Sequence, residues 1–385
     1  MKLAPLLFLT RVFRFVAGAK SPILFPSVGD IPPTMEAKFN HSLAREQCKP
    51  WFTILRELRA NVFNDGKCND QAREALRLTF HDAVGRSRML EDSGSFGGGG
   101  ADGSIIRFAD TELANPANDG LEDIVLALRD VADNHNVSYG DIIQFAGAVG
   151  LSNCPGSPRL TFHAGRPDAV APSPPGLVPS PTDSADVLLA RMSDAGFTIE
   201  ETVALLAAHS VARQKTIDPS VPNVPLDSTP EVFDTKFYSE MLLNGTCYPG
   251  KGRSTAEVKS PLKNVMRLTS DAAIAQHPST AGIWRSFAGN HDVMRAAFRG
   301  AMQKLANQGH VNLVDCSFVI PTPAPLARQT PSNPSPHGTL GPGLPNKGSR
   351  LAVRTGTTVP YVSREASSRS RAGSRVGPCQ AVGSA

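Results

Sequence analysis

Apolar residues recur at helical spacing along most of the middle of the chain. Apolar residues three and four positions apart share one face of a helix, whereas a strand would show strict alternation. Long alternating runs are absent from the sequence. The helical pattern occupies eight segments, at residues 51–63, 69–85, 120–135, 138–151, 198–213, 230–242, 264–276 and 292–307. The pattern predicts a mainly α-helical domain over residues 46–320.

Two of these segments begin with residues that favour a helix start. Asn69 or Asp70 opens the second segment and can accept a hydrogen bond from a free N–H of the first turn. Thr198 and Glu201 have the spacing of a capping box, in which each side chain binds the other residue's backbone. We expect helix N termini at both places.

The composition changes towards both ends of the chain. Residues 20–45 are expected to form an extended leader. From residue 321 the chain is rich in Pro, Gly, Ser, Thr and Arg, and its eight Lys and Arg against one Glu give it a charge of +7. Such a segment buries too little apolar surface to offset its ordering entropy, so residues 321–385 are predicted to be a disordered tail. The whole chain carries +4, so the remainder carries −3 and does not favour nucleic-acid binding.

The first 19 residues resemble a secretory signal. Lys2 provides a basic start, residues 3–9 are an apolar run, and residues 17–19 (Ala-Gly-Ala) suit cleavage. Arg11 and Arg14 interrupt the apolar region, which leaves an uncleaved anchor or a different start as alternatives. Residues 1–19 therefore predict an extracellular protein. No other run approaches the roughly 20 apolar residues of a membrane span, and no membrane association is expected.

The cysteines and sequons agree with secretion. The six cysteines are widely scattered and form no CxxC pair, which favours disulfides over a zinc site. Their spacing does not choose among the possible pairings. Asn-X-Ser/Thr sequons occur at Asn40, Asn136 and Asn244.

The stretch "RLTFHDAVGRSRMLEDSGSFGGGGADGS" brings unusual chemistry together. Arg77 and His81 lie four apart, on one face of the predicted helix. No Gly-Lys-Ser/Thr follows the glycines, so a phosphate loop is disfavoured, and a flexible linker is the plain alternative. The oxygen donors Asp82, Asp102 and Ser104 suit calcium.

A second histidine has similar surroundings. His209 is followed by Ser210, and Asp227, Thr229 and Asp234 come soon after. These oxygens also suit calcium, although a turn with a helix cap would explain them. Two helical histidines, one accompanied by an arginine, indicate a haem site with one imidazole on iron and the other facing the open side.

Several motifs together resemble the secreted fungal haem peroxidases of class II, a family of lignin, manganese, versatile and generic peroxidases. They are "RLTFHD", "FGGGGADGS", "FAGAVGLSNCPG", "GLVPSP", "AAHSVA" and "PLDSTPEVFD", and the resemblance runs from about residue 48 to 320. It implies a mainly α fold in two parts, with haem b between a distal and a proximal half.

The resemblance also implies roles for individual residues. The distal side would carry Arg77, Phe80 and His81, with Asn118 and Glu112 supporting the histidine. His209 would bind iron and Asp271 would accept its other ring proton. The resemblance implies one calcium ion on Asp82, the Gly100 carbonyl, Asp102 and Ser104, and another on Ser210, Asp227, Thr229, the Val232 carbonyl and Asp234. It implies disulfides Cys48–Cys316 and Cys68–Cys154, and leaves Cys247 and Cys379 as a further pair that spacing does not establish.

Departures from the family indicate the subtype. Manganese peroxidases use three carboxylates, and the matching positions here are Asp70, Glu74 and Lys215. A lysine at that place should repel Mn²⁺. The exposed tryptophan of lignin and versatile types corresponds to Ala204. We therefore expect a generic peroxidase that uses hydrogen peroxide to oxidise phenols and other small aromatic donors.

Other interpretations remain open. They are a manganese- or lignin-oxidising enzyme, an intracellular class I haem peroxidase, and a non-catalytic secreted protein of the same fold. Class I enzymes lack these disulfides and calcium motifs, and the intact Arg77 and His81 argue against a non-catalytic protein. The chain is expected to act as a monomer.

Overall fold

The structure is a computed structural model that describes residues 46–327. The expected signal segment, the leader, the sequon at Asn40, Cys379 and residues 328–385 of the expected tail lie outside the described residues. The chain divides into residues 1–46 and 47–385, and the description concerns the second unit. Among the described residues, no helix is both long and apolar enough to cross a bilayer.

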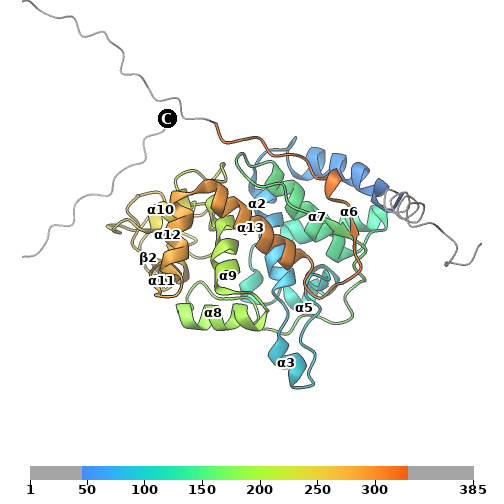
Figure 1. Ribbon diagram of the computed structural model, residues 1–385, viewed down its shortest axis with the longest axis horizontal. Coiled ribbons are helices and arrows are strands. Elements are labelled where there is room, and N and C mark those ends of the chain that lie inside the picture. The colour runs from blue at the N-terminus through green and yellow to red at the C-terminus, as the bar shows by residue number, and fades with distance from the viewer. Residues whose placement is uncertain (1–45, 328–385) are drawn as a thin grey trace, which may run out of the picture. The chain divides into compact units, whose positions relative to one another are not determined.

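The first half is a group of helices around α2 and α7, which pack side by side (Figure 1). Close approach of these two helices depends on glycine: a Cβ at Gly147 would lie 2.1 Å from the Thr79 side chain, and one at Gly150 would lie 3.0 Å from the Ala72 carbonyl. After a helix at residues 46–57, the elements are η2 (Leu58–Val62), α2 (Asp70–Ala83), α3 (Arg88–Asp92), α4 (Ser104–Arg107), α5 (Ala109–Glu112), η3 (Pro116–Asn118), α6 (Glu122–His135) and α7 (Tyr139–Ser152).

The second half is built on α13, which packs against α9 and also contacts α2 of the first half. Its helices are α8 (Ala185–Asp194), α9 (Ile199–Leu205), η4 (Leu206–Val211), α10 (Lys236–Met241), α11 (Thr269–Gln276), α12 (Ala281–Gly289), α13 (His291–Ala306) and η5 (Ser317–Val319). Short antiparallel pairs join β1 (His163–Ala164) to β4 (Val314–Asp315) and β2 (Glu257–Val258) to β3 (Arg267–Leu268). The mainly α fold is thus confirmed.

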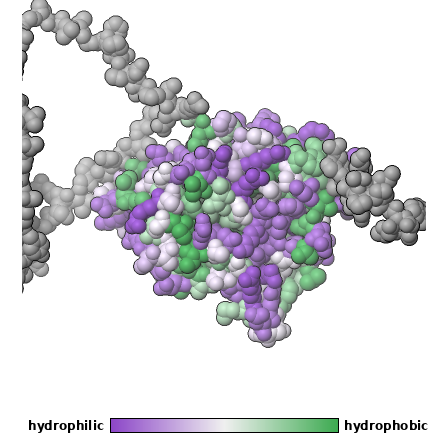
Figure 2. Space-filling view, in the orientation of Figure 1, coloured by the Kyte–Doolittle hydropathy of each residue, from purple (hydrophilic) through white to green (hydrophobic). Residues whose placement is uncertain are grey.

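The surface and the core separate as expected for a folded enzyme domain. Figure 2 shows a mostly hydrophilic face with small, scattered hydrophobic areas. The largest fully buried side chains include Trp284, Tyr238, Phe63, Phe145 and Phe162. Burial of these aromatic rings, each with a large apolar area, is a main source of stability for both halves.

The predicted helix starts are confirmed. The Asn69 side chain accepts a hydrogen bond from the Ala72 N–H at 3.0 Å and caps α2. Thr198 and Glu201 form the complete capping box of α9. Both caps satisfy N–H groups that the first turn cannot pair internally.

Other boundaries differ from the sequence pattern. Helices α8 and α12 were not predicted, and residues 264–268 are not helical. Met266 instead donates its N–H to the Pro225 carbonyl at 2.9 Å, so pairing with a distant segment overrides the helical pattern. The segment 230–242 forms helix only from Lys236, and the segment 198–213 changes to a 3₁₀-helix after Leu205.

Two disulfides join segments that are distant in sequence. Cys48 bonds to Cys316 and Cys68 bonds to Cys154, which confirms both expected pairs. Beyond the expected boundary at residue 320, the described chain continues to residue 327. In this segment the Ala324 carbonyl accepts the Gly156 N–H at 2.8 Å, so residues 321–327 contact the helical body.

Candidate active site

The distal histidine is held by a short chain of hydrogen bonds. His81 Nδ1 lies 2.8 Å from Asn118 Oδ1, and Asn118 Nδ2 donates to the Glu112 carbonyl at 2.9 Å. Since the amide nitrogen of Asn118 already faces a carbonyl, its oxygen faces His81, and Nδ1 of the ring must carry the proton. His81 Nε2 therefore keeps a lone pair. The expected support of His81 by Asn118 and Glu112 is present.

Arg77 lies beside this lone pair. Its Nε donates to His81 Nε2 at 3.1 Å, and its two terminal nitrogens donate to the carbonyls of Asp119 and Ala117 at 2.9 and 3.0 Å. Burial and the Arg77 charge lower the pKa of His81 to about 3, against the opposing hydrogen bond to Asn118. Burial disfavours the charged imidazole, so His81 is neutral at neutral pH.

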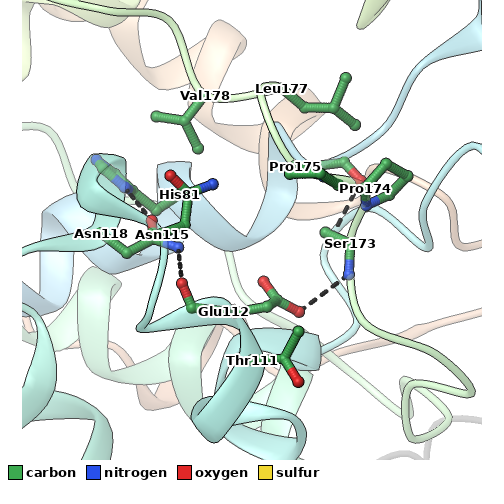
Figure 3. Close-up of a pocket in the computed structure, with 11 residues that line it drawn as sticks. His81, Thr111, Glu112, Asn115, Asn118, Ser173, Pro174, Pro175, Leu177 and Val178 are labelled. Carbon is green, nitrogen blue, oxygen red and sulfur yellow. Dashed lines mark hydrogen bonds between the residues drawn. The ribbon is translucent and has the colours of Figure 1, made fainter.

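A cavity of about 110 Å³ opens next to His81. Figure 3 shows Leu177 and Val178 across this cavity from Thr111 and Glu112. The Glu112 carboxylate accepts the Ser173 N–H at 3.0 Å. Sequence reasoning missed Ser173 and Leu177, although the proline-rich run that contains them was visible.

The proximal histidine lies on η4, directly after α9. His209 Nδ1 is 3.0 Å from Asp271 Oδ2, on α11, and Asp271 is 1% exposed. Burial alone would lower the pKa of His209, but the Asp271 carboxylate raises it above its usual value. The Phe237 ring packs edge-on against His209, with 5.4 Å between centroids. With Nδ1 engaged, Nε2 is the nitrogen left to bind a metal.

The distal and proximal groups are close enough to interact electrostatically. The Arg77 charge acts on His209 and opposes the rise of its pKa. Phe80, the residue before His81 on α2, packs edge-on against the His81 ring, with ring centroids 6.0 Å apart. The structure therefore places Arg77 and Asn118 against His81, and Asp271 against His209.

The glycine loop returns to the end of α2. Asp82 Oδ2 accepts the Gly103 N–H at 3.1 Å, whereas its Oδ1 is buried without a partner. Asp102 accepts the Ser104 N–H at 3.1 Å. A Cβ at Gly99 would lie 1.7 Å from Asp102 Oδ2, so only glycine allows this approach. Burial and the Asp102 charge raise the pKa of Asp82 well above its usual value.

The second oxygen-rich stretch surrounds Ser210. Ser210 Oγ and Asp227 Oδ2 are buried without hydrogen-bond partners. Thr229 donates its hydroxyl to Asp234 Oδ2 at 2.9 Å. Burial raises the pKa of Asp227 to about 9. Within residues 46–327 no three or more His, Cys, Asp or Glu side chains cluster as a metal site.

The positions matched to a manganese site are paired internally. Lys215 Nζ contacts Glu74 Oε1 in an ion pair. Asp70 pairs with Arg73 at 2.9 Å, a partner that sequence reasoning missed. Each carboxylate thus has a cation from the chain itself. Ala204, at the position of the exposed tryptophan, is 1% exposed.

Two histidines on facing elements, one backed by a carboxylate and the other beside an arginine and an asparagine, are the arrangement of a helical haem peroxidase. The comparisons with known proteins agree. Residues 54–290 match the family described as "Peroxidase", and residues 293–341 match the "Fungal peroxidase extension region". The chain belongs to the peroxidase family and is a haem peroxidase of the fungal class II type.

Similar proteins are named peroxidases. A low-redox potential peroxidase of Taiwanofungus camphoratus is 62% identical over 286 residues, which cover 74% of this chain and 81% of the relative. A peroxidase of Arthromyces ramosus is 50% identical over 283 residues, 73% of this chain and 78% of the relative. A versatile peroxidase of Pleurotus eryngii is 47% identical over 287 residues, 74% of this chain and 78% of the relative.

Proposed function

We propose that this peroxidase is of the generic type, which reduces hydrogen peroxide at the distal cavity and oxidises phenols and similar small donors in one-electron steps. The observation that carries the proposal is the hydrogen-bond chain His81–Asn118–Glu112, with Arg77 donating to the unprotonated nitrogen of His81. His209, oriented by Asp271, completes the site on the other side.

The residues fit haem b on the proximal side. His209 has one ring nitrogen fixed by Asp271 and the other available for iron, and Phe237 packs against its ring. A buried carboxylate that accepts the Nδ1 proton makes the imidazole a more basic ligand. Haem would supply the redox-active iron, which gives electrons to peroxide and then takes electrons from the donors.

On the distal side the protein moves one proton. Neutral His81 accepts a proton at Nε2 from one peroxide oxygen and returns it to the other, which leaves as water. The Asn118 hydrogen bond keeps the proton on Nδ1, so Nε2 is unprotonated at the start of the step, with Arg77 as its hydrogen-bond donor before peroxide arrives. Arg77, held by two backbone carbonyls, stabilises the negative charge that develops as the oxygen–oxygen bond breaks.

The internal ion pairs support the generic subtype. In this chain Lys215 and Arg73 already neutralise Glu74 and Asp70, which would otherwise attract Mn²⁺. Ala204 offers no ring for electron transfer from bulky donors. What remains is oxidation of small aromatic donors near the haem.

The oxygen-rich stretches fit two calcium ions. Buried carboxylate and hydroxyl oxygens without partners, on Asp82, Ser210 and Asp227, are costly unless a cation binds them. In this proposal the first ion is held by Asp82, the Gly100 carbonyl, Asp102 and Ser104, and the second by Ser210, Asp227, Thr229, the Val232 carbonyl and Asp234.

We further propose that the protein is extracellular and monomeric, and that it binds neither nucleic acid nor membranes. The support is the signal-like start, the disulfides of the described residues and the negative charge outside the tail. Size-exclusion chromatography tests the monomeric state. Detection of the protein in the culture supernatant of the expressing organism tests the extracellular location.

The test compares three histidine variants. His81→Ala should bind haem but react with hydrogen peroxide about 10³-fold more slowly, since a positioned acid–base group contributes about 10²–10⁴-fold. His209→Ala should lose haem or hold it loosely, because iron loses its protein ligand. His277→Ala, outside the site and paired with Asp186, is the control and should change neither. Full peroxide reactivity of His81→Ala would contradict the assignment.

A further inference from the structure

A proline-rich loop, residues 172–181, borders the cavity beside His81. Five of its ten residues are prolines, which carry no backbone N–H, and the loop belongs to no strand. It therefore offers mostly carbonyl oxygens and cannot hold itself by backbone pairing. A segment of this kind must be fixed by donors from elsewhere in the chain.

Arg191, on the unpredicted helix α8, supplies these donors. Its Nε donates to the Leu177 carbonyl at 2.8 Å. One terminal nitrogen donates to the carbonyls of Val84 and Arg86 at 2.8 and 2.5 Å, and the other contacts the Asp194 carboxylate. Arginine has five N–H donors in a rigid plane and no acceptor, so it can join three carbonyls at once, which lysine cannot do in this geometry.

The three carbonyls come from two segments beside the cavity: Leu177 on the loop, and Val84 and Arg86, which flank the lining residue Gly85. Leu177 lies on the loop and lines the cavity. Val84 is the C-cap of α2, three residues after His81. Without a cation between them, these carbonyl oxygens would repel one another. The Arg191 side chain is only 12% exposed, so water screens its bonds little.

Helix α8 provides a firm base for the guanidinium. It packs against α9, which leads to His209, and against α11, which carries Asp271. Asp194, which contacts Arg191, also accepts the Met89 N–H at 2.8 Å. Leu177 is thus tied to elements of the proximal half through Arg191, in addition to the bond from the Ser270 N–H to the Pro181 carbonyl at the end of the loop.

We propose that Arg191 is a positioning residue that sets the width of the distal cavity, and so the size of the peroxide that reaches His81. Its guanidinium fixes the distance between the Leu177 wall and the end of α2. Ser173, bonded to Glu112 and to the Gly85 carbonyl, and Pro181, bonded to the Ser270 N–H, anchor the two ends of the loop. Loss of the Arg191 link frees the Leu177 segment between these anchors, where the neighbouring prolines offer no replacement donors. This inference rests on the distal role proposed for His81.

The experiment uses the full haem-loaded enzyme and two peroxides of different size. Stopped-flow absorbance of the haem band gives the rate constants for hydrogen peroxide and for tert-butyl hydroperoxide. The variants are Arg191→Gln, which keeps one donor group, and Arg191→Lys, which keeps the charge but not the planar fork. Arg295→Gln, an arginine on the exposed face of α13, is the matched control.

We expect the rate ratio of the small to the bulky peroxide to fall about tenfold in Arg191→Gln and to a smaller extent in Arg191→Lys. Arg295→Gln should keep the ratio of the unmodified enzyme. In Arg191→Ala, millimolar methylguanidinium should restore part of the ratio by filling the vacated place.

Three outcomes overturn the proposal: an unchanged ratio in both Arg191 variants, an equal change in the control, or failure of both variants to fold with haem. The last would mean that Arg191 serves stability alone. His81→Ala separates this proposal from the function on which it rests. Loss of the acid–base group should slow the reaction with both peroxides, whereas fast reaction of both would contradict the role of His81 and not that of Arg191.

Discussion

At the scale of single residues, the chemistry depends on which nitrogen of each histidine is already engaged. In both His81 and His209 the Nδ1 atom faces a fixed acceptor, Asn118 in one case and Asp271 in the other. Burial and the Arg77 charge lower the pKa of His81 despite its bond to Asn118, whereas the Asp271 carboxylate raises the pKa of His209 against the effect of burial. The same side chain is thereby suited to proton transfer on one side and to metal binding on the other.

The proposed generic subtype depends most on a single lysine. Lys215→Asp should raise the rate of Mn²⁺ oxidation at least tenfold and leave phenol oxidation within twofold, because it removes the cation on Glu74 and adds a third carboxylate. A tenfold gain in affinity needs only about 1.4 kcal/mol. Steady-state assays with Mn²⁺ and a phenol measure both.

Lys263→Asp is the control for net charge, since Lys263 is exposed. An equal rise in Mn²⁺ oxidation in Lys215→Asp and Lys263→Asp would mean that net charge, and not the position of Lys215, controls the rate. Efficient Mn²⁺ turnover by the unmodified enzyme at low metal concentration would contradict the generic subtype.

At the scale of elements, the site depends on how helices approach and where they stop. Helix α2 presents Arg77 and His81 to the cavity while Gly147 and Gly150 let α7 lie against its other face. Helix α9 ends at Leu205, and the tighter η4 turn carries His209 towards Asp271. An α-helix continued through residue 209 would present the histidine in a different direction, since a 3₁₀-helix has three residues per turn and not 3.6.

The start of α9 gives a pH-dependent contribution to stability. Burial would raise the pKa of Glu201, but Lys304 and the Thr198 N–H lower it overall. Glu201 Oε2 lies 2.5 Å from Lys304 Nζ and accepts the Thr198 N–H at 2.8 Å. A lowered carboxyl pKa stabilises the fold above the unfolded value of 4.5, and this contribution disappears as the pH falls through the folded pKa.

Glu201→Gln should therefore lower the free energy of unfolding by about 1 kcal/mol at pH 7, and the difference should shrink below pH 4.5. Urea unfolding at several pH values measures it. Glu200→Gln, at the exposed neighbouring position, should have little effect at any pH. A loss that is the same at pH 3 and pH 7 would mean that the charge of Glu201 is not involved.

At the scale of the whole molecule, two oxygen-rich loops adjoin the two histidines. Asp82 follows His81 and Ser210 follows His209, and each has a buried oxygen without a partner. The disulfide Cys68–Cys154 and helix α13 hold the helices of the body together, and His291 at the start of α13 contacts the Phe233 carbonyl of the second loop at 2.9 Å. Cations bound there would set the direction of both catalytic segments at once.

Chelation should consequently lower peroxidase activity at least tenfold before haem is lost. We expect two calcium ions per chain by elemental analysis, and recovery on adding Ca²⁺ but not Mg²⁺, which prefers a smaller octahedral site. The haem absorbance band monitors cofactor loss separately. Full activity after exhaustive chelation, with no calcium found in the purified protein, would contradict both proposed calcium sites.

The amino-acid sequence by itself determined the helical class, the capped starts of α2 and α9, and the shared face of Arg77 and His81. These features depend on residues within a few positions of one another, where helical spacing and side-chain capping act directly. The motifs also indicated the haem and oxygen-ligand residues, through the resemblance to a family.

Only the tertiary structure decided which distant groups meet. His81 and Asn118 are 37 positions apart, His209 and Asp271 are 62 apart, and Lys215 and Glu74 are 141 apart. Residues 264–268 left their helical pattern for the same reason, since pairing with Pro225 was available only in the folded chain. Arg191 shows most clearly what a local sequence pattern cannot predict. Its guanidinium binds carbonyls that lie 14 and 107 positions away in the chain, and only the folded chain brings them together.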